Sequence, residues 1–135
     1  MKFRQFTVSD FNSVIDLWQR AGLILSRSDT LEGIKEKLKR DSELFFVLEE
    51  NGTIIGVVMG SYDGRRGWIN HLAVDPEHQG NNLGQKIISE LEIRLKKIGC
   101  EKLNLLIEMD NKQVKGFYEN LGYKQDELLF MEKWI

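Results

Sequence analysis

Two spacings of apolar residues predict the order of the first elements of the chain. Residues 2–6 alternate between polar and apolar side chains, which is typical of a short strand. Residues 11–22 and residues 28–41 carry apolar side chains at intervals of three and four. Ser, Thr or Asp, the residues that cap helices, stand at the start of each stretch. We therefore expect a strand followed by two amphipathic helices.

Short apolar runs broken by turn residues come next, at residues 44–49, 54–62 and 67–74. An Asn-Gly pair at 51–52 separates the first two runs, and an Asp-Gly pair at 63–64 separates the last two. Both pairs readily supply the positive φ angles that tight turns between antiparallel strands require. The pattern predicts a meander of three antiparallel strands.

The second half of the chain alternates between helical and strand patterns. Residues 82–98 have helical spacing and end at Gly99, residues 102–108 are typical of a buried strand, and residues 110–122 again have helical spacing. Residues 123–135 predict one or two final strands. A strand, helix and strand in this order form a parallel pair. The fold class is therefore α/β, of the α+β type, with a mixed, mostly antiparallel sheet and helices on both faces.

Length and composition indicate one packed domain. The chain has 135 residues, 41% of them hydrophobic, and no linker or repeat divides it, so we expect a single domain over residues 1–135. Cys100 is the only cysteine, which excludes an internal disulfide and a thiolate metal cluster and favours a reducing compartment. Because no long apolar run or signal segment stands out, we expect a cytoplasmic protein without a membrane partner.

The formal net charge of −2 argues against nucleic-acid binding through bulk positive charge, so any phosphate must be held locally. The candidate place is HLAVDPEHQGNNLGQKII, where a predicted strand passes through a tight loop directly into a helix. A helix start leaves about four backbone N–H groups unpaired and carries roughly half a positive charge. Gly80 and Gly84 would let an anion approach the backbone. The alternative is a tight turn that binds nothing.

Two motifs together resemble the GNAT superfamily of acyl-CoA-dependent N-acetyltransferases over nearly the whole chain. One is the loop segment LAVDPEHQGNNLGQKII, and the other is N-x-x-V-x-x-F-Y-E-N-x-G-Y, from Asn111 to Tyr123. The family's loop pattern Q/R-x-x-G-x-G/A falls on Gln79, Asn82 and Gly84. Asn82 stands where the pattern has glycine, and asparagine enters left-handed conformations more readily than most residues.

This resemblance implies that acetyl-CoA is the cosubstrate. The pyrophosphate would lie on backbone N–H groups of the loop and helix start, which are those of Gln79, Gly80, Asn81, Asn82, Leu83, Gly84 and Gln85. The pantetheine arm would pair with the strand edge at Leu72, Ala73 and Val74, since its amides can bond to a strand as a peptide does. The family exposes that edge by splaying its parallel strands, here residues 68–74 and 102–108.

The side chain of Asn111 is open to two interpretations. The local pattern makes it a helix cap, and the resemblance implies that it also faces the cofactor arm.

The resemblance implies that Tyr118 protonates the departing thiolate, although an aromatic residue at this spacing is also typical of a core. A phenol has a pKa near 10, so it stays neutral at working pH and can donate a proton. Alternation along the strand allows only one of Asn70 and His71 to share a face with Trp68, and the resemblance favours Asn70 as the residue that faces the site. His71 and Glu108 stay open as proton acceptors.

The reaction implied is direct transfer of an acetyl group from acetyl-CoA to a primary amine in a ternary complex. The acceptor is either a small-molecule amine or a protein N-terminus, bound between the first two helices, their connecting loop and the final strands. A non-catalytic acyl-CoA sensor and an unrelated interaction domain are the alternatives. Dimers are common among similar proteins, which leaves a homodimer open.

Overall fold

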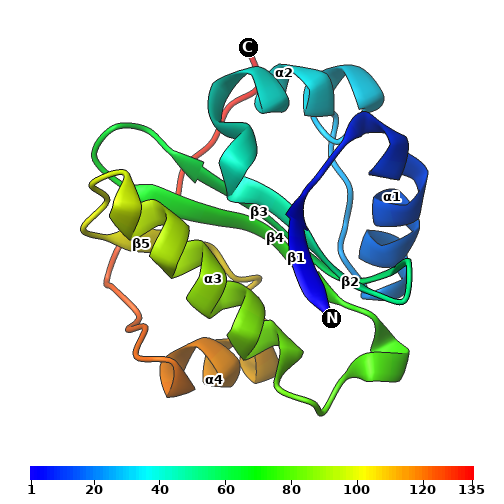
Figure 1. Ribbon diagram of the computed structural model, residues 1–135. Coiled ribbons are helices and arrows are strands. Elements are labelled where there is room, and N and C mark those ends of the chain that lie inside the picture. The colour runs from blue at the N-terminus through cyan, green and yellow to red at the C-terminus, as the bar shows by residue number, and fades with distance from the viewer.

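A mixed five-stranded sheet in the order β1-β2-β3-β4-β5 forms the centre of the computed structural model, which describes all 135 residues (Figure 1). The strands are β1 (Lys2–Gln5), β2 (Phe45–Glu50), β3 (Thr53–Tyr62), β4 (Gly67–Val74) and β5 (Leu103–Leu105). Each of the first three pairs antiparallel with the next, and β4 pairs parallel with β5. The predicted mixed, mostly antiparallel sheet is confirmed.

Two helices cover each face of the sheet (Figure 1). The four are α1 (Phe11–Arg20), α2 (Leu31–Asp41), α3 (Leu83–Lys97) and α4 (Lys112–Asn120). Short 3₁₀ turns at Val8–Asp10, Ser42–Leu44 and Pro76–His78 join elements. None of the helices combines the length and the apolar character that a membrane span requires.

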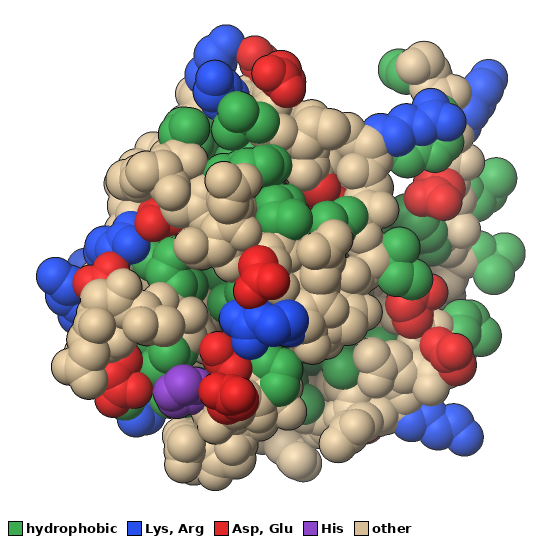
Figure 2. Space-filling model, turned by 90° about the vertical axis from the view of Figure 1, so that its right-hand side faces the viewer, with side chains coloured by type: hydrophobic (Ala, Val, Ile, Leu, Met, Phe, Trp, Pro, Cys, Tyr) green, Lys and Arg blue, Asp and Glu red, His purple; other side chains and the backbone are tan.

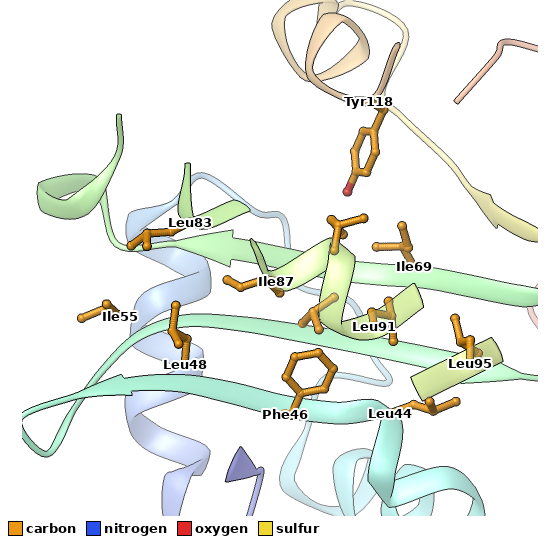
Figure 3. Close-up of a cluster of buried hydrophobic side chains, with 12 residues drawn as sticks. Leu44, Phe46, Leu48, Ile55, Ile69, Leu83, Ile87, Leu91, Leu95 and Tyr118 are labelled. Atoms are coloured by element: carbon orange, nitrogen blue, oxygen red, sulfur yellow. The ribbon is translucent and has the colours of Figure 1, made fainter. Parts of the chain in front are cut away.

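Side chains of α3 carry the larger of the two cores. Ile87, Leu91 and Leu95 follow one another along the buried face of this helix and pack on the sheet, with Tyr118 of α4 at the margin of the cluster (Figure 3). On the opposite face, α1 and α2 contribute Leu17, Trp18 and Ile34 to a second cluster. Packing on both faces fixes where β4 ends and α3 begins.

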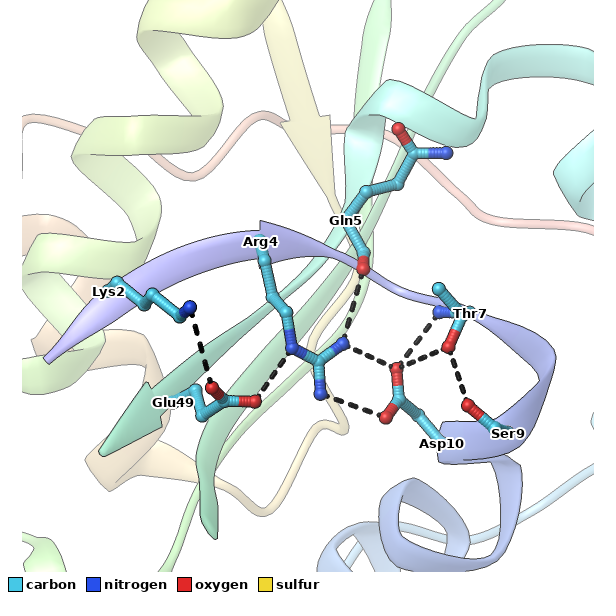
Figure 4. A network of polar contacts seen from close by, with 7 residues as sticks. All are labelled: Lys2, Arg4, Gln5, Thr7, Ser9, Asp10 and Glu49. Atoms are coloured by element: carbon cyan, nitrogen blue, oxygen red, sulfur yellow. Dashed lines mark hydrogen bonds and ion pairs between the residues drawn. The ribbon is translucent and has the colours of Figure 1, made fainter. Parts of the chain in front are cut away.

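A polar network centred on Arg4 fastens α1 to the sheet (Figure 4). The Arg4 guanidinium donates to both oxygens of Asp10, at 2.7 and 2.9 Å, and to Glu49 of β2 at 2.7 Å. Asp10 is buried and also accepts the backbone N–H of Thr7. The hydrogen bond from Arg4 is the main cause that lowers the pKa of Asp10. The network is structural and joins β1, β2 and the start of α1.

The expected final strands are absent, and that part of the prediction was wrong. Residues 124–135, the C-terminal tail, form no strand and take part in no backbone–backbone hydrogen bond. The tail runs from α4 past the sheet toward α2 (Figure 1). A strand needs an edge that takes up its N–H and C=O groups, and none in this chain does so. The strand expected at 102–108 is likewise reduced to Leu103–Leu105.

Replacing Leu91 by alanine tests the packing of α3. Leu91 is fully buried, so Leu91→Ala should lower the free energy of unfolding by about 2–5 kcal/mol through lost contacts and a residual cavity. Urea unfolding followed by circular dichroism measures it. Ile93→Ala, on the half-exposed side of the same helix, is the matched control and should stay within about 0.5 kcal/mol of the wild type. Equal losses in the two variants would contradict this packing.

Candidate active site

The edge of β4 toward β5 is open over more than half its length. Only three residue pairs join the two strands: Gly67 with Leu103, Trp68 with Asn104, and Ile69 with Leu105. Beyond Ile69, β4 continues to Val74 and pairs with β3 alone. Residues 70–74 therefore present backbone groups to the space that β5 leaves free. The expected splaying of the parallel pair is confirmed.

A β-bulge lies where the two strands part. Met59 of β3 pairs with His71, whereas the next residue, Gly60, pairs with Ile69, so Asn70 is an extra residue on β4. A bulge of this kind shifts the alternation of side chains along a strand by one position. Beyond Asn70, each side chain of β4 therefore points to the face opposite to the one that regular alternation from Trp68 would give.

The bulge places Trp68, Asn70 and His71 on the same face, toward α1. His71 pairs with Met59, which belongs to the α1 cluster, and Trp68 pairs with Ser61, two residues further along β3. The Asn70 Nδ2 donates to the Ser61 Oγ at 3.1 Å. The expectation that only one of Asn70 and His71 shares a face with Trp68 was wrong, because regular alternation does not continue through a bulge.

Asp75 anchors the loop that follows β4. Its backbone N–H donates to the Ile55 carbonyl at 2.8 Å, and its carboxylate accepts the N–H of Glu77 at 2.9 Å. Arg20, at the end of α1, lies 3.2 Å from the same carboxylate. The Glu77 N–H, followed by Arg20, lowers the pKa of Asp75, so the carboxylate stays ionised. These contacts hold the first residue of the loop in place.

The start of α3 carries a run of free backbone donors. None of the N–H groups from Gln79 to Gln85 donates a hydrogen bond, and the first helical donor is Lys86, to the Asn82 carbonyl. Gly80 has a φ of +92° and Asn82 a φ of +59°, both in the left-handed region. The conformation anticipated for Asn82 is therefore confirmed. With the positive end of α3 behind them, these N–H groups can receive an anion.

The structure gives Gly84 a further reason that the sequence does not indicate. A Cβ built there would lie 3.1 Å from the Cζ of Phe117, a residue of α4. The room beside Gly84 is thus taken by an aromatic ring that packs α4 against the start of α3. The Gly84 N–H itself stays unpaired.

Tyr118 lies on α4 between the two helices and the sheet, and its phenol oxygen points from α4 toward β4 near Ile69 (Figure 3). The residue is 5% exposed, and burial raises its pKa well above the ordinary value. Phe117 and Tyr123 hold its ring by edge contacts at centroid distances of 5.0 and 5.4 Å. The phenol is therefore neutral and held at the point where β4 and β5 part.

Two other residues that the sequence singles out are Asn111, which caps a helix, and Glu108, which lies in an exposed turn. The Asn111 side chain accepts the Val114 N–H at 3.2 Å and so caps α4, which leaves its amide N–H₂ group free. Glu108 was expected on a strand but lies beyond β5 in an exposed turn, where its carbonyl accepts the Asn111 N–H. No three His, Cys, Asp or Glu side chains come close enough together to hold a metal ion.

Asp29 is a site residue that sequence analysis missed. It lies in the connection between α1 and α2, and its Oδ1 is 3.0 Å from the His71 Nε2. The Asp29 side chain is buried, and its other oxygen accepts the N–H of Ser26 at 2.8 Å. The His71 side chain is 23% exposed and stands edge-on to Trp18. The spacing Ser-x-x-Asp signals such a turn, but nothing local indicates its distant partner.

Comparison with known proteins agrees with this geometry. The model of the Acetyltransferase (GNAT) family matches residues 11–123, and the chain belongs to this family. It is 42% identical to an acetyltransferase of Yersinia pestis (strain Pestoides F) and 41% identical to one of Yersinia enterocolitica. Each match covers 98% of this chain and 94% of the relative. The chain is thus an N-acetyltransferase by family.

Solved structures share the fold at lower identity. The PaiA N-acetyltransferase of Thermoplasma acidophilum, in complex with coenzyme A, has a TM-score of 0.83 and 19% identity. That match covers 94% of this chain and 91% of the other. The ribosomal-protein-S18-alanine N-acetyltransferase of Escherichia coli has a TM-score of 0.77 and 21% identity, over 93% and 78% of the two chains.

Substitutions at the two left-handed positions test the loop. Gly80→Ala has room for its Cβ but costs roughly 1–2 kcal/mol at a positive φ, so the loop should relax away from its present shape. Affinity for CoA, measured by isothermal titration calorimetry, should fall about tenfold. Asn82→Gly keeps the left-handed conformation without strain and should bind within about twofold of the wild type. Unchanged CoA affinity in Gly80→Ala would contradict the role of this loop.

Proposed function

We propose that the chain transfers an acetyl group from acetyl-CoA to a primary amine by direct attack in a ternary complex. The observation that carries the proposal is the run of unpaired N–H groups from Gln79 to Gln85 beside the open edge of β4. Two relatives support it. One is named as an N-acetyltransferase in Yersinia pestis, and a structural neighbour was solved with coenzyme A.

The unpaired N–H groups before α3 and the open edge of β4 together indicate how the cofactor would bind. Its pyrophosphate would accept hydrogen bonds from the N–H groups of residues 79–85, where the helix end adds positive charge. The pantetheine arm would lie along Leu72, Ala73 and Val74 and pair with them as an added strand does. Asn111, which caps the start of α4, would donate to the arm from its free N–H₂ group. This placement leads the thioester to Asn70.

Tyr118 would serve as the proton donor to the departing thiolate. Collapse of the tetrahedral intermediate breaks the carbon–sulfur bond and leaves the electron pair on sulfur. A neutral phenol at the parting of β4 and β5 can donate to this sulfur as the charge develops. Its raised pKa keeps it protonated over the whole working range.

His71 would take the proton that the amine must lose. An alkylamine has a pKa of about 10.4, so at neutral pH it is protonated and cannot attack. If the His71 Nε2 donates to the Asp29 carboxylate, the Nδ1 keeps its lone pair and can accept a proton. Asn70, exposed beside it, has a free side-chain carbonyl that would orient the incoming amine.

The acceptor is a small-molecule amine or the amino group of a protein N-terminus. Structural neighbours named for each kind of acceptor share the fold. One is the S18-alanine enzyme of Escherichia coli, and the other is a glucosamine-6-phosphate N-acetyltransferase of Arabidopsis thaliana. The Arabidopsis structure has a TM-score of 0.69 and 24% identity, over 99% of this chain and 98% of the other. A panel of amines and N-terminal peptides, assayed by release of the CoA thiol, decides between them. CoA binding without thiol release from any acceptor would favour a non-catalytic acyl-CoA sensor. We expect the enzyme to work in the cytoplasm.

Removing the Tyr118 hydroxyl separates chemistry from binding. Tyr118→Phe keeps the ring and should lower kcat by about 10²-fold or more while CoA affinity stays near that of the wild type. Steady-state kinetics and calorimetry give the two values. Tyr123→Phe is the matched control, because its hydroxyl bonds to Glu92 instead of facing β4, and it should keep kcat. Equal turnover in the wild type and Tyr118→Phe would remove this residue from the mechanism.

The proposed base predicts a loss of activity that depends on pH. His71→Gln should lower kcat/KM for the amine about 10²-fold near neutral pH. The loss should shrink as the pH rises, because a growing share of the amine is then neutral without help. CoA affinity and the far-UV spectrum should match those of the wild type. A loss of the same size at every pH would point to packing against Trp18 instead of proton transfer.

A further inference from the structure

The last residues of β3 lack a partner strand on one side. Pairing between β2 and β3 reaches only as far as Met59, so the main chain of β3 from Gly60 to Tyr62 has no strand opposite it there. Two side chains of α2 bond to this main chain instead. The Lys37 Nζ donates to the Gly60 carbonyl, and the Asp41 carboxylate accepts the N–H of Tyr62 at 3.0 Å. Side chains thus replace two hydrogen bonds of the sheet.

The same two side chains form a buried ion pair, the Lys37–Asp41 pair. Lys37 donates to the Asp41 Oδ1, and Asp41 uses its Oδ2 for the bond to β3. The two side chains are 13% and 11% exposed, whereas the charged side chains on the face drawn in Figure 2 lie at the surface. Burial is the main cause that lowers the pKa of Lys37. Because a buried ion pair is often no more stabilising than apolar residues of the same volume, stability alone is a weak reason for this one.

The bonds from α2 hold β3 on either side of Ser61. Gly60 precedes this residue and Tyr62 follows it, and the Ser61 Oγ accepts the Asn70 Nδ2 at 3.1 Å. Asn70 is the extra residue of the bulge and has no partner in the ladder between β3 and β4. No other hydrogen bond holds its side chain. The orientation of the Asn70 amide therefore depends on where β3 places Ser61.

We propose that the Lys37–Asp41 pair positions the Asn70 side chain for the acceptor amine. It acts through the main chain of β3 and the Ser61 hydroxyl, and so neither member needs to touch the substrate. This role rests on the proposed function, in which the side-chain carbonyl of Asn70 orients the amine. Without the pair, two main-chain groups of β3 would lose their partners, and the end of the strand would no longer have a single arrangement.

A double-variant cycle with Asn70 separates positioning from general stability. Lys37→Met should raise the KM for the amine about tenfold, the loss expected for one hydrogen bond, while CoA affinity stays within about twofold of the wild type. Asn70→Ala should raise this KM by a similar factor. In the Asn70→Ala background, Lys37→Met should cause no further rise, because its effect passes through Asn70. Lys39→Met, in an exposed ion pair of the same helix, is the matched control and should keep the wild-type KM.

Two kinetic outcomes would overturn the proposal. One is an unchanged KM in Lys37→Met, and the other is a pair of increases that multiply in the double variant, which would mean that the ion pair supports the fold without acting on Asn70. If no amine is acetylated by the wild type, the proposed function fails, and the spectrum of the protein then tests the positioning by itself.

The side-chain amide signals of Asn70 in the ¹⁵N spectrum report its orientation without turnover. In Lys37→Met they should shift in the same direction as in Ser61→Ala, which removes the hydroxyl that holds the amide. In Lys39→Met they should stay in place. If Lys37→Met does not fold, Asp41→Asn replaces it, since it keeps an oxygen for the main-chain N–H while removing the charge, and the same shifts are expected. Asn70 signals that match those of the wild type in the folded variant would contradict the role of the pair.

Discussion

The early end of the pairing between β4 and β5 is the constraint on which the site depends. β5 has only three residues, and the bulge at Asn70 lies just where that pairing stops. Phe117 of α4 packs beside Gly84 at the start of α3, and Tyr118 packs in the cluster on the same face of the sheet. Over residues 70–74, β4 is left with an edge that pairs with no other strand. That edge leads directly into the loop before α3.

The electrostatic potential at the start of α3 is set by nearby groups and differs from what the net charge of the chain suggests. The net charge of −2 would repel a diphosphate, yet the free N–H groups of residues 79–85 lie at the positive end of a 15-residue helix. No acidic side chain occupies the first turn of α3, and Arg94, Lys96 and Lys97 stand in its last turn. The charges of the side chains thus complement the helix dipole instead of cancelling it. Anion binding here needs main-chain geometry alone.

Much of this architecture could be predicted from local sequence patterns. The meander, the helices and the left-handed Asn82 follow from periodicity and turn chemistry, since each depends on neighbouring residues. The bulge could not be predicted, because one extra residue inside GWINHLAV leaves the apolar pattern unchanged. The contact between Asp29 and His71 joins positions far apart in the chain, and only the fold brings them together. The tail has the composition of a strand, but pairing depends on an available edge, which no local pattern encodes.

The place where CoA binds can be read from a titration of the ¹⁵N-labelled protein, followed residue by residue in the amide spectrum. The largest shifts should fall on the amides of residues 79–85, with a second group along residues 70–74 of β4. Shifts that cluster elsewhere, or an unchanged spectrum at saturating CoA, would contradict a binding site at this loop and strand edge.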